Sequence, residues 1–129
     1  MNEDIFTIFA EGKLAVGDER IALAQLAWQA HPQFVGVSMK NLVTLEQTGG
    51  AFSCHLVKIE PGRAIDRHSH PASIELHEVV NGEGVCRTEQ GDIPYVPGTM
   101  GIMAVGSPHE IIASDQGLCL FAKFVTVTT

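Results

Sequence analysis

Positively charged side chains are scarce in this sequence. Its 129 residues hold 8 Lys and Arg against 15 Asp and Glu, which gives a formal net charge of −7. Such a chain would repel a phosphate backbone, so the composition argues against nucleic-acid binding. An anionic membrane surface is disfavoured for the same reason. We expect neither nucleic acid nor a membrane among the partners of this protein.

Long apolar runs are also lacking. The longest uncharged stretch, 21–39, contains Gln, His and Pro, and the next, 93–109, is broken by three Pro and three Gly. A membrane-spanning helix needs about 20 consecutive, predominantly apolar residues. The opening residues, MNEDIFTIF, are acidic where a secretory signal peptide is basic. These features predict a cytoplasmic location.

Cysteine is rare as well, with only Cys54, Cys86 and Cys119 present. Their odd number and wide spacing fit neither a disulfide framework nor a zinc knuckle, which favours a reducing compartment. We interpret each of them as a small buried hydrophobic residue. With 45% hydrophobic and 18% charged residues, the chain has the composition of a single globular domain.

Glycine and proline are distributed unevenly along the chain. Residues 1–48 hold three Gly and one Pro, whereas residues 49–129 hold ten Gly and five Pro. Short apolar runs separated by such residues indicate an all-β domain. We read Asn81-Gly82 as a hairpin turn and 115–117 as another turn. About eight to ten strands in a sandwich or small barrel are expected, from segments that include 35–45, 52–60, 74–80, 84–88, 94–96, 100–105, 110–113 and 118–127.

The first third of the chain has a different pattern. Asp18 could cap a helix over residues 19–30, because the run ALAQLAWQA consists of good helix formers. The pair His31-Pro32 would end that helix, since the residue before a proline avoids helical geometry. An extended lead-in is the alternative. Further upstream, the apolar residues of 5–9 would either cover their own barrel or be exchanged with a second copy.

Three of the six histidines fall within ten residues, His68, His70 and His77, and Glu75 lies among them. Because alternate side chains of a strand share a face, His68 and His70 point the same way, and so do Glu75 and His77. Up to four metal-capable groups thus converge from two neighbouring strands. Imidazole and carboxylate suit Fe(II), Mn(II), Ni(II), Co(II) or Zn(II). A lone His-x-His on a sheet surface usually has no function, so the interpretation depends on the whole run.

That run resembles the first motif of the cupin superfamily. It reads Gly62, five residues, His68-Ser-His70, four residues, Glu75, six residues, Gly82. The second cupin motif is matched over 98–113, where Gly98, Gly106 and His109 take their expected positions. Two positions depart from that motif, because Ala104 replaces a proline and Ala113 replaces an asparagine. Neither is a ligand position.

The resemblance covers roughly residues 35–125 and implies a double-stranded β-helix, or jelly-roll barrel, with a site inside. We accordingly expect a lead-in segment over 1–34 and a cupin barrel over 35–129. Carried over position by position, the resemblance makes His68, His70, Glu75 and His109 the ligands of a divalent transition metal. Spacing alone suggested the first three, and the family supplies the fourth. A cupin barrel with an empty or degenerate site is the competing interpretation.

His77 lies outside the usual cupin ligand set. Its two-residue offset from Glu75 aims it at the barrel interior, where we predict a catalytic role as an acid/base or substrate contact. The alternatives are a core histidine bonded to backbone and a side chain displaced to the barrel mouth. His55 lies on a strand expected to flank the site, whereas His31 is expected at a helix end or on the surface.

Cupins with this ligand set include dioxygenases, isomerases, decarboxylases and lyases, and the fold does not choose among them. An ion that prefers six ligands would keep about two positions open for water or substrate. We favour an oxygenase-type enzyme. The alternatives are a non-catalytic module that binds or senses a small molecule through a metal, and a metal-dependent isomerase or lyase.

The expected pocket lining is apolar, which favours a small carbonyl or phenolic substrate over a phosphate. We expect its walls to come from Val57, Ile59, Val79, Met100, Ile102, Met103, Phe121 and Phe124. Small single-barrel cupins resemble one another in forming homodimers, so a homodimer is expected here too.

Overall fold

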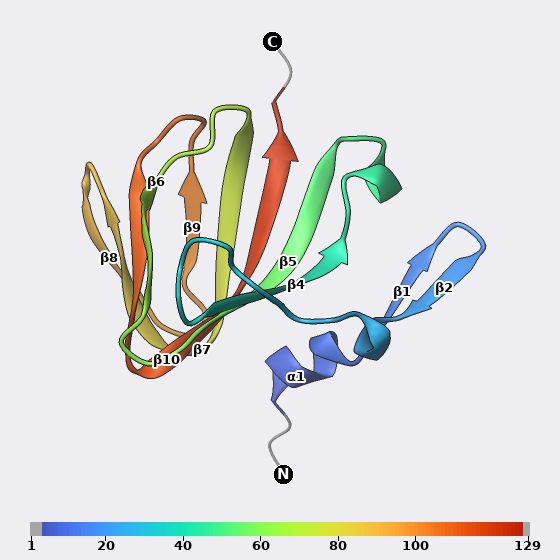
Figure 1. The fold of residues 1–129 in the computed structure, drawn as a ribbon. Coiled ribbons are helices and arrows are strands. Elements are labelled where there is room, and N and C mark those ends of the chain that lie inside the picture. The colour runs from blue at the N-terminus through green and yellow to red at the C-terminus, as the bar shows by residue number, and fades with distance from the viewer. Residues whose placement is uncertain (1–3, 128–129) are drawn as a thin grey trace.

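A computed structural model describes residues 4–127 of the chain (Figure 1). The elements begin with α1 (Ile5–Ala10), β1 (Lys13–Val16), β2 (Glu19–Ala22), the 3-10 helix η1 (Leu23–Gln25) and β3 (Gln29–Ala30). They continue with β4 (Val37–Val43), the 3-10 helix η2 (Glu46–Thr48), β5 (Phe52–Ile59), β6 (Ala64–His68), β7 (Ser73–Thr88), β8 (Gly91–Tyr95), β9 (Met100–Met103) and β10 (His109–Thr126). Over this described range, no helix has the length and apolar character needed to cross a membrane.

Two long strands, β7 and β10, organise the fold. Each bends near its middle, at the bottom of Figure 1, and so contributes to two sheets. The first half of β7 and the second half of β10 belong to the larger sheet, whose strand order is β3-β4-β5-β10-β7-β9. The other halves belong to the smaller sheet, whose strand order is β6-β10-β7-β8. These pairings are antiparallel, and the predicted all-β jelly roll with a short N-terminal helical segment is confirmed.

The turns predicted at Asn81-Gly82 and at 115–117 are wrong, because the strands continue through both positions. Gly82 and Gly117 have positive φ angles of 80° and 76°, and the pairing register shifts beside them. In β10, Ile111 is buried before the bend and Leu120 after it, so the inward-facing residues change from odd to even numbers. The glycines thus form bulges that bend each strand and reverse its two faces.

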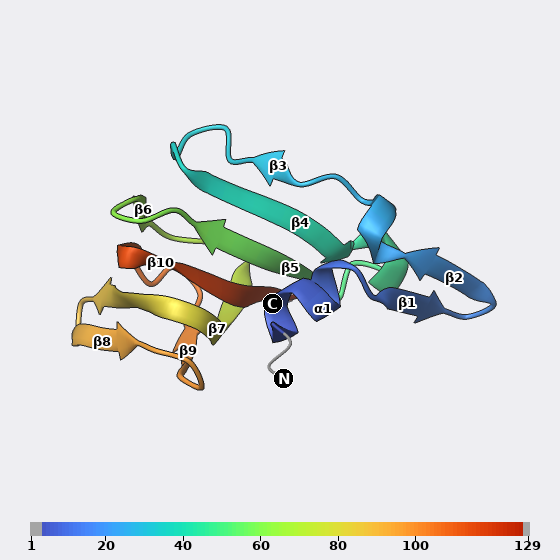
Figure 2. The same cartoon turned by 90° about the horizontal axis from the view of Figure 1, so that it is seen from below.

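The helix predicted over residues 19–30 is wrong as well. Gly17, with a φ angle of 55°, and Asp18 form the turn of the β1–β2 hairpin, so Asp18 caps no helix there. The only α-helix of the described range is α1, which Asp4 caps by accepting a bond from the Phe6 N–H at 3.0 Å. Helix propensity is a weak preference, and strand pairing together with burial of Leu23 outweighs it. Figure 2 shows the hairpin extending away from the sandwich.

Two apolar clusters stabilise the molecule. One fills the space between the sheets, and the other lies on the outer face of the larger sheet, where α1 and η1 pack against Leu42 and Leu56. Phe6 is buried in this outer cluster and covers its own sandwich, whereas Ile5, Ile8 and Phe9 stay 52%, 42% and 48% exposed. Formation of a homodimer stays a prediction.

Candidate metal centre

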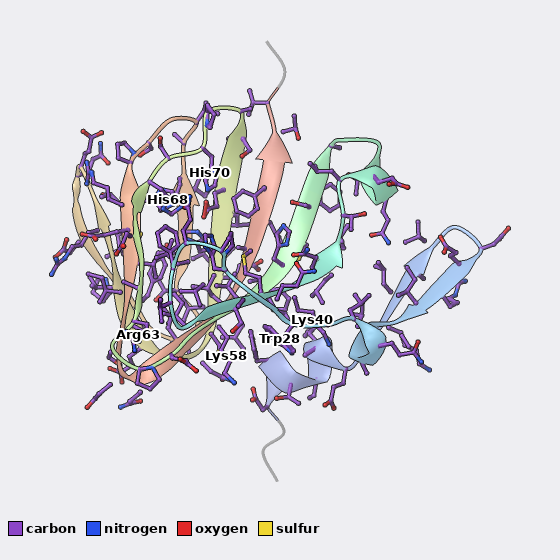
Figure 3. The ribbon with its side chains drawn as sticks, in the orientation of Figure 1. Trp28, Lys40, Lys58, Arg63, His68 and His70 are labelled. Atoms are coloured by element: carbon purple, nitrogen blue, oxygen red, sulfur yellow. The ribbon has the colours of Figure 1, made fainter. Side chains whose placement is uncertain are left out.

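Three strands and one loop bring the four predicted ligands together at one end of the sandwich. His68 ends β6, His70 lies in the following loop, Glu75 is on β7 and His109 begins β10. His68 and His109 are direct partners in the β6–β10 pairing. Figure 3 shows His68 and His70 close to each other near this end. Each of the four residues offers one ligand atom, and these atoms all lie within 4.8 Å of one another.

Two of the three histidines of this group, His68 and His109, are oriented by backbone carbonyls. The Nδ1 of His68 lies 2.8 Å from the carbonyl oxygen of Asp66, and the Nδ1 of His109 lies 3.0 Å from that of Ser107. A carbonyl only accepts, so both Nδ1 atoms carry the proton and donate it. The Nε2 lone pairs are then available to a cation, as in histidines that bind metals.

Two buried acceptors face each other in the centre of the group. The Oε2 of Glu75 and the Nε2 of His109 are 3.5 Å apart, and neither has a hydrogen-bond partner of good geometry. The Nε2 of His70 lies 3.1 Å from the same carboxylate oxygen. Lone pairs gathered away from water need a cation among them, which a proton or a metal ion can supply. The donor set therefore fits a divalent transition metal.

The charges of the group are strongly coupled. Burial alone would raise the pKa of Glu75, but the imidazoles of His109, His70 and His77 that face the carboxylate outweigh it and hold that pKa well below its usual range. Burial also opposes a charge on His109, yet the nearby Glu75 carboxylate and the bond to the Ser107 carbonyl raise its pKa. Burial lowers the pKa of His68. Of these two histidines, His109 is therefore the one whose protonated form the site favours.

His77 shares the inward face of β7 with Glu75, as expected, but lies behind it. Only 1% of the residue is exposed, and its Nε2 contacts the Oε1 of Glu75 at 2.5 Å. Its Nδ1 lies 2.8 Å from the hydroxyl of Tyr95. His77 does not line the cavity described below. Its catalytic role stays a prediction, and the geometry allows His77 to act only through Glu75.

A cavity of about 340 Å³ opens beside the group. Phe34, Met39 and Phe124 form its apolar walls, and the Phe124 ring meets His70 edge-on with the ring centroids 4.9 Å apart. None of the described residues that line it is Lys or Arg. The complete lining is His31, Gln33, Phe34, Met39, His55, His68, Ser69, His70, Glu75 and Phe124.

Sequence reasoning located this lining only in part. Phe124 is in the cavity, but Phe121 is wrongly assigned because it packs in the outer cluster. Met100 and Ile102 are wrong too, since β9 turns them to solvent at 60% and 72% exposure. The other expected residues, Val57, Ile59, Val79 and Met103, belong to the buried core.

Three wall residues were missed or underrated. Phe34 and Met39 were overlooked, and His31 lines the cavity instead of lying at a helix end. The His31 and Phe34 rings stack with their centroids 4.5 Å apart. His55 also lines the cavity, with its ring nitrogens held by Asn41 at 2.6 Å and Ser53 at 2.9 Å. No local sequence signal marks these positions, because the loop before β4 and the strands β4 and β5 reach the site only through folding.

Comparison with known proteins identifies this architecture. A family model described as the ChrR cupin-like domain matches residues 16–128. No curated protein sequence matches the chain significantly.

Several solved structures share the fold. A predicted oxalate decarboxylase from Thermotoga maritima is 21% identical with a TM-score of 0.74, covering 81% of this chain and 96% of its own. A cupin-superfamily sugar phosphate isomerase from Silicibacter pomeroyi is 23% identical with a TM-score of 0.68, covering 84% and 76%. The polyketide cyclase RemF from Streptomyces resistomycificus is 15% identical with a TM-score of 0.71, covering 86% of both chains. At these identities the likeness shows the fold alone.

Proposed function

The chain belongs to the ChrR cupin-like family, and from this premise we propose that it is a metal-dependent, oxygenase-type enzyme for a small carbonyl or phenolic compound. One observation carries the proposal: four metal-capable atoms within 4.8 Å of one another adjoin a cavity with apolar walls. Solved structures that share the fold bear names of a decarboxylase, an isomerase and a cyclase, so the fold hosts several chemistries.

His68, His70, Glu75 and His109 would hold the ion through three imidazoles and one carboxylate. When bound, such an ion supplies Lewis-acid chemistry toward a carbonyl or phenol and, if it is Fe(II), reactivity toward dioxygen. Four protein donors leave room for other ligands on an ion that prefers six. Glu75 contributes the single formal negative charge of the set, so the ion would retain positive charge to attract an electron-rich oxygen.

The volume and lining of the cavity favour a small ligand without strong charge. Its volume of about 340 Å³ is near the lower end of the usual range for ligand pockets. Phosphate and carboxylate groups are usually recognised by Arg or Lys, and the described lining has neither. Phe34 and Phe124 present aromatic surface on which a flat ring or diketone can pack while water is excluded.

Metal analysis followed by oxygen uptake tests this function. The protein is purified without oxygen, loaded with Fe(II), and assayed against a panel of diketones and catechols. We expect stoichiometric iron and oxygen consumption with at least one compound. Stoichiometric iron without consumption on any compound would instead support a metal-dependent binding module. Absence of bound metal after loading with each of the five candidate ions would overturn the metal-centre assignment.

A further inference from the structure

The two carboxylate oxygens of Glu75 have different surroundings. Oε2 faces the Nε2 atoms of His70 and His109, at 3.1 and 3.5 Å. Oε1 points the other way and contacts the Nε2 of His77 at 2.5 Å. Beyond His77, the Tyr95 hydroxyl lies 2.8 Å from Nδ1. A buried line of contacts therefore leads from β8 through β7 to the proposed metal position.

The chemistry of these groups fixes the direction of the bond to Glu75 and, for a neutral His77, that of the bond to Tyr95. A carboxylate only accepts, so His77 carries a proton on Nε2 and donates it to Glu75. In a neutral imidazole the Nδ1 then accepts, and Tyr95 is the donor. Burial raises the pKa of Tyr95, so its hydroxyl stays protonated and able to donate. Each polar atom from Oε1 of Glu75 to the Tyr95 hydroxyl has a partner, as a buried arrangement requires.

Gly101 on β9 leaves the space that this arrangement needs. Gly101 pairs with His77 across the β7–β9 ladder. A Cβ added at Gly101 would overlap the hydroxyl oxygen of Tyr95. Tyr95 itself has 0% exposure and makes edge contact with the His77 ring, with the centroids 5.7 Å apart. The phenol is thus confined by β9 on one side and by His77 on the other.

We propose that His77 and Tyr95 are positioning residues that reserve Oε1 of Glu75, so that only Oε2 is presented to the metal. A carboxylate held in this way acts as a one-oxygen ligand and leaves more of the ion accessible from the cavity. The inference depends on the proposed metal site and not on the proposed reaction. It assigns Tyr95 a role that no local sequence motif indicates.

Two substitutions at one position separate the two hydrogen bonds. In His77→Gln the amide nitrogen falls near the position of Nε2, so the bond to Glu75 is kept and the one to Tyr95 is lost. In His77→Asn the side-chain oxygen can take the place of Nδ1 and accept from Tyr95, whereas the side chain is too short to reach Glu75, so the reverse holds. Both variants remove the imidazole and leave a buried amide, which makes each the control of the other. Circular dichroism and thermal unfolding of the metal-free proteins monitor the fold.

Co(II) is the probe, because its visible spectrum reports the ligands while a competition titration gives the dissociation constant. We expect His77→Gln, which loses only the Tyr95 bond, to bind Co(II) a few-fold more weakly, and His77→Asn to bind it about 10–100-fold more weakly with an altered spectrum. Tyr95→Phe should weaken binding in the wild-type background and have no further effect in His77→Asn, because the link is already cut there. Equal dissociation constants and spectra for the Gln and Asn variants would overturn the proposal.

A second measurement requires no metal. Nitrogen NMR of the metal-free wild-type protein, labelled at histidine, reports which ring nitrogen of His77 carries the proton. We expect a single tautomer protonated at Nε2. The Nδ1-protonated tautomer or a mixture would overturn the proposed arrangement, even if the variants fold poorly. Wild-type protein that shows this tautomer but binds no Co(II) would overturn the metal centre and, with it, the positioning role.

Discussion

Gly82 on β7 lies directly against Gly117 on β10, so that a Cβ on Gly82 would overlap the carbonyl oxygen of Gly117. Both residues have positive φ angles, 80° and 76°, and both lie where the long strands bend. The two bends thus lie opposite each other in the β7–β10 pairing. This close approach lets a single pair of strands supply both sheets of the sandwich.

Replacing Gly82 by alanine should therefore destabilise the fold strongly. We expect Gly82→Ala to lose more than about 2 kcal/mol of unfolding free energy, since it combines an unfavourable φ with overlap against backbone. Gly49→Ala is the matched control, because Gly49 has a φ angle of 64° but no atom within 4 Å of an added Cβ. That control should lose about 1–2 kcal/mol. Urea denaturation measures both, and equal losses would contradict the role of the close approach.

Removing His70 should release the metal while leaving the sandwich folded. The His70 side chain is 34% exposed, so alanine there opens no closed core cavity. We expect His70→Ala to lose most of the bound metal, because one of the four protein donors is removed. Metal analysis after desalting checks this, with Ser69→Ala as the neighbouring control. Full metal content in His70→Ala would show that the ligand assignment is incorrect.

The contribution of His109 to the stability of the metal-free protein should be lost as the pH rises. The pKa of His109 is raised above its usual 6.5, so its contribution is complete below that value and lost as the pH passes the raised one. Burial lowers the pKa values of His31, His55 and His68, so these residues contribute a trend of the opposite sign near pH 6.5, and the loss from His109 is measured above about pH 7.5, where they are neutral both folded and unfolded.

Metal binding should have the opposite pH dependence. The ion must displace the His109 proton, so its affinity should increase as the pH rises through the same interval. Chemical denaturation at pH 7.5, 8.0 and 8.5, with and without excess Zn(II), should show opposing trends. A metal-free stability that increases with pH over this interval would contradict the protonated His109–Glu75 pair.

Lys40 should contribute measurable stability through a single buried hydrogen bond. Only 3% exposed, it donates from Nζ to the carbonyl oxygen of Ala10, at the end of α1, over 2.7 Å. It also lies 5.9 Å from the centre of the Trp28 ring, and Figure 3 shows the two residues together. We expect Lys40→Met to lose about 1–3 kcal/mol, because the carbonyl remains buried without a donor.

The neighbouring strand offers a control for Lys40. Lys58 lies on the same outer face but is exposed, so Lys58→Met should change the free energy of unfolding by less than about 0.5 kcal/mol. Urea denaturation of the two variants gives the comparison. Equal effects would indicate that the lysine charge in general, and not the bond to Ala10, stabilises the molecule.

The sequence predicted the ligand group better than the cavity around it, and strand geometry explains why. Glu75 and His77 share a face because they are two residues apart in one strand, which is a local property. Phe121 and Phe124 were both expected in the pocket lining, but they lie on opposite faces of β10, and the bulge at Gly117 reverses the faces and so sets which one is turned inward. A glycine read only as a turn residue gave no sign of that reversal.

The contacts that connect distant parts of the chain were beyond sequence reasoning. His109 was found through the resemblance to cupins, since nothing in its local sequence pairs it with His68. Tyr95 meets His77 only because β8 and β9 both pair with β7, in different sheets. The helix expected at 19–30 is wrong for a related reason. Part of that segment pairs as β2 with β1 through a turn at Gly17, and the helix-forming composition of the run gives no sign of this pairing.

The donors of the proposed site come from β6, β7, β10 and the loop after β6, and so from both layers of the sandwich. An ion held there would connect the two layers at their open end. Separating the two layers would then require breaking bonds between the ion and its ligands. Dissociation of the ion and local opening of β6 would therefore occur together. Loaded protein should consequently exchange the amide hydrogens of β6 far more slowly than stripped protein, although no hydrogen bond has been added.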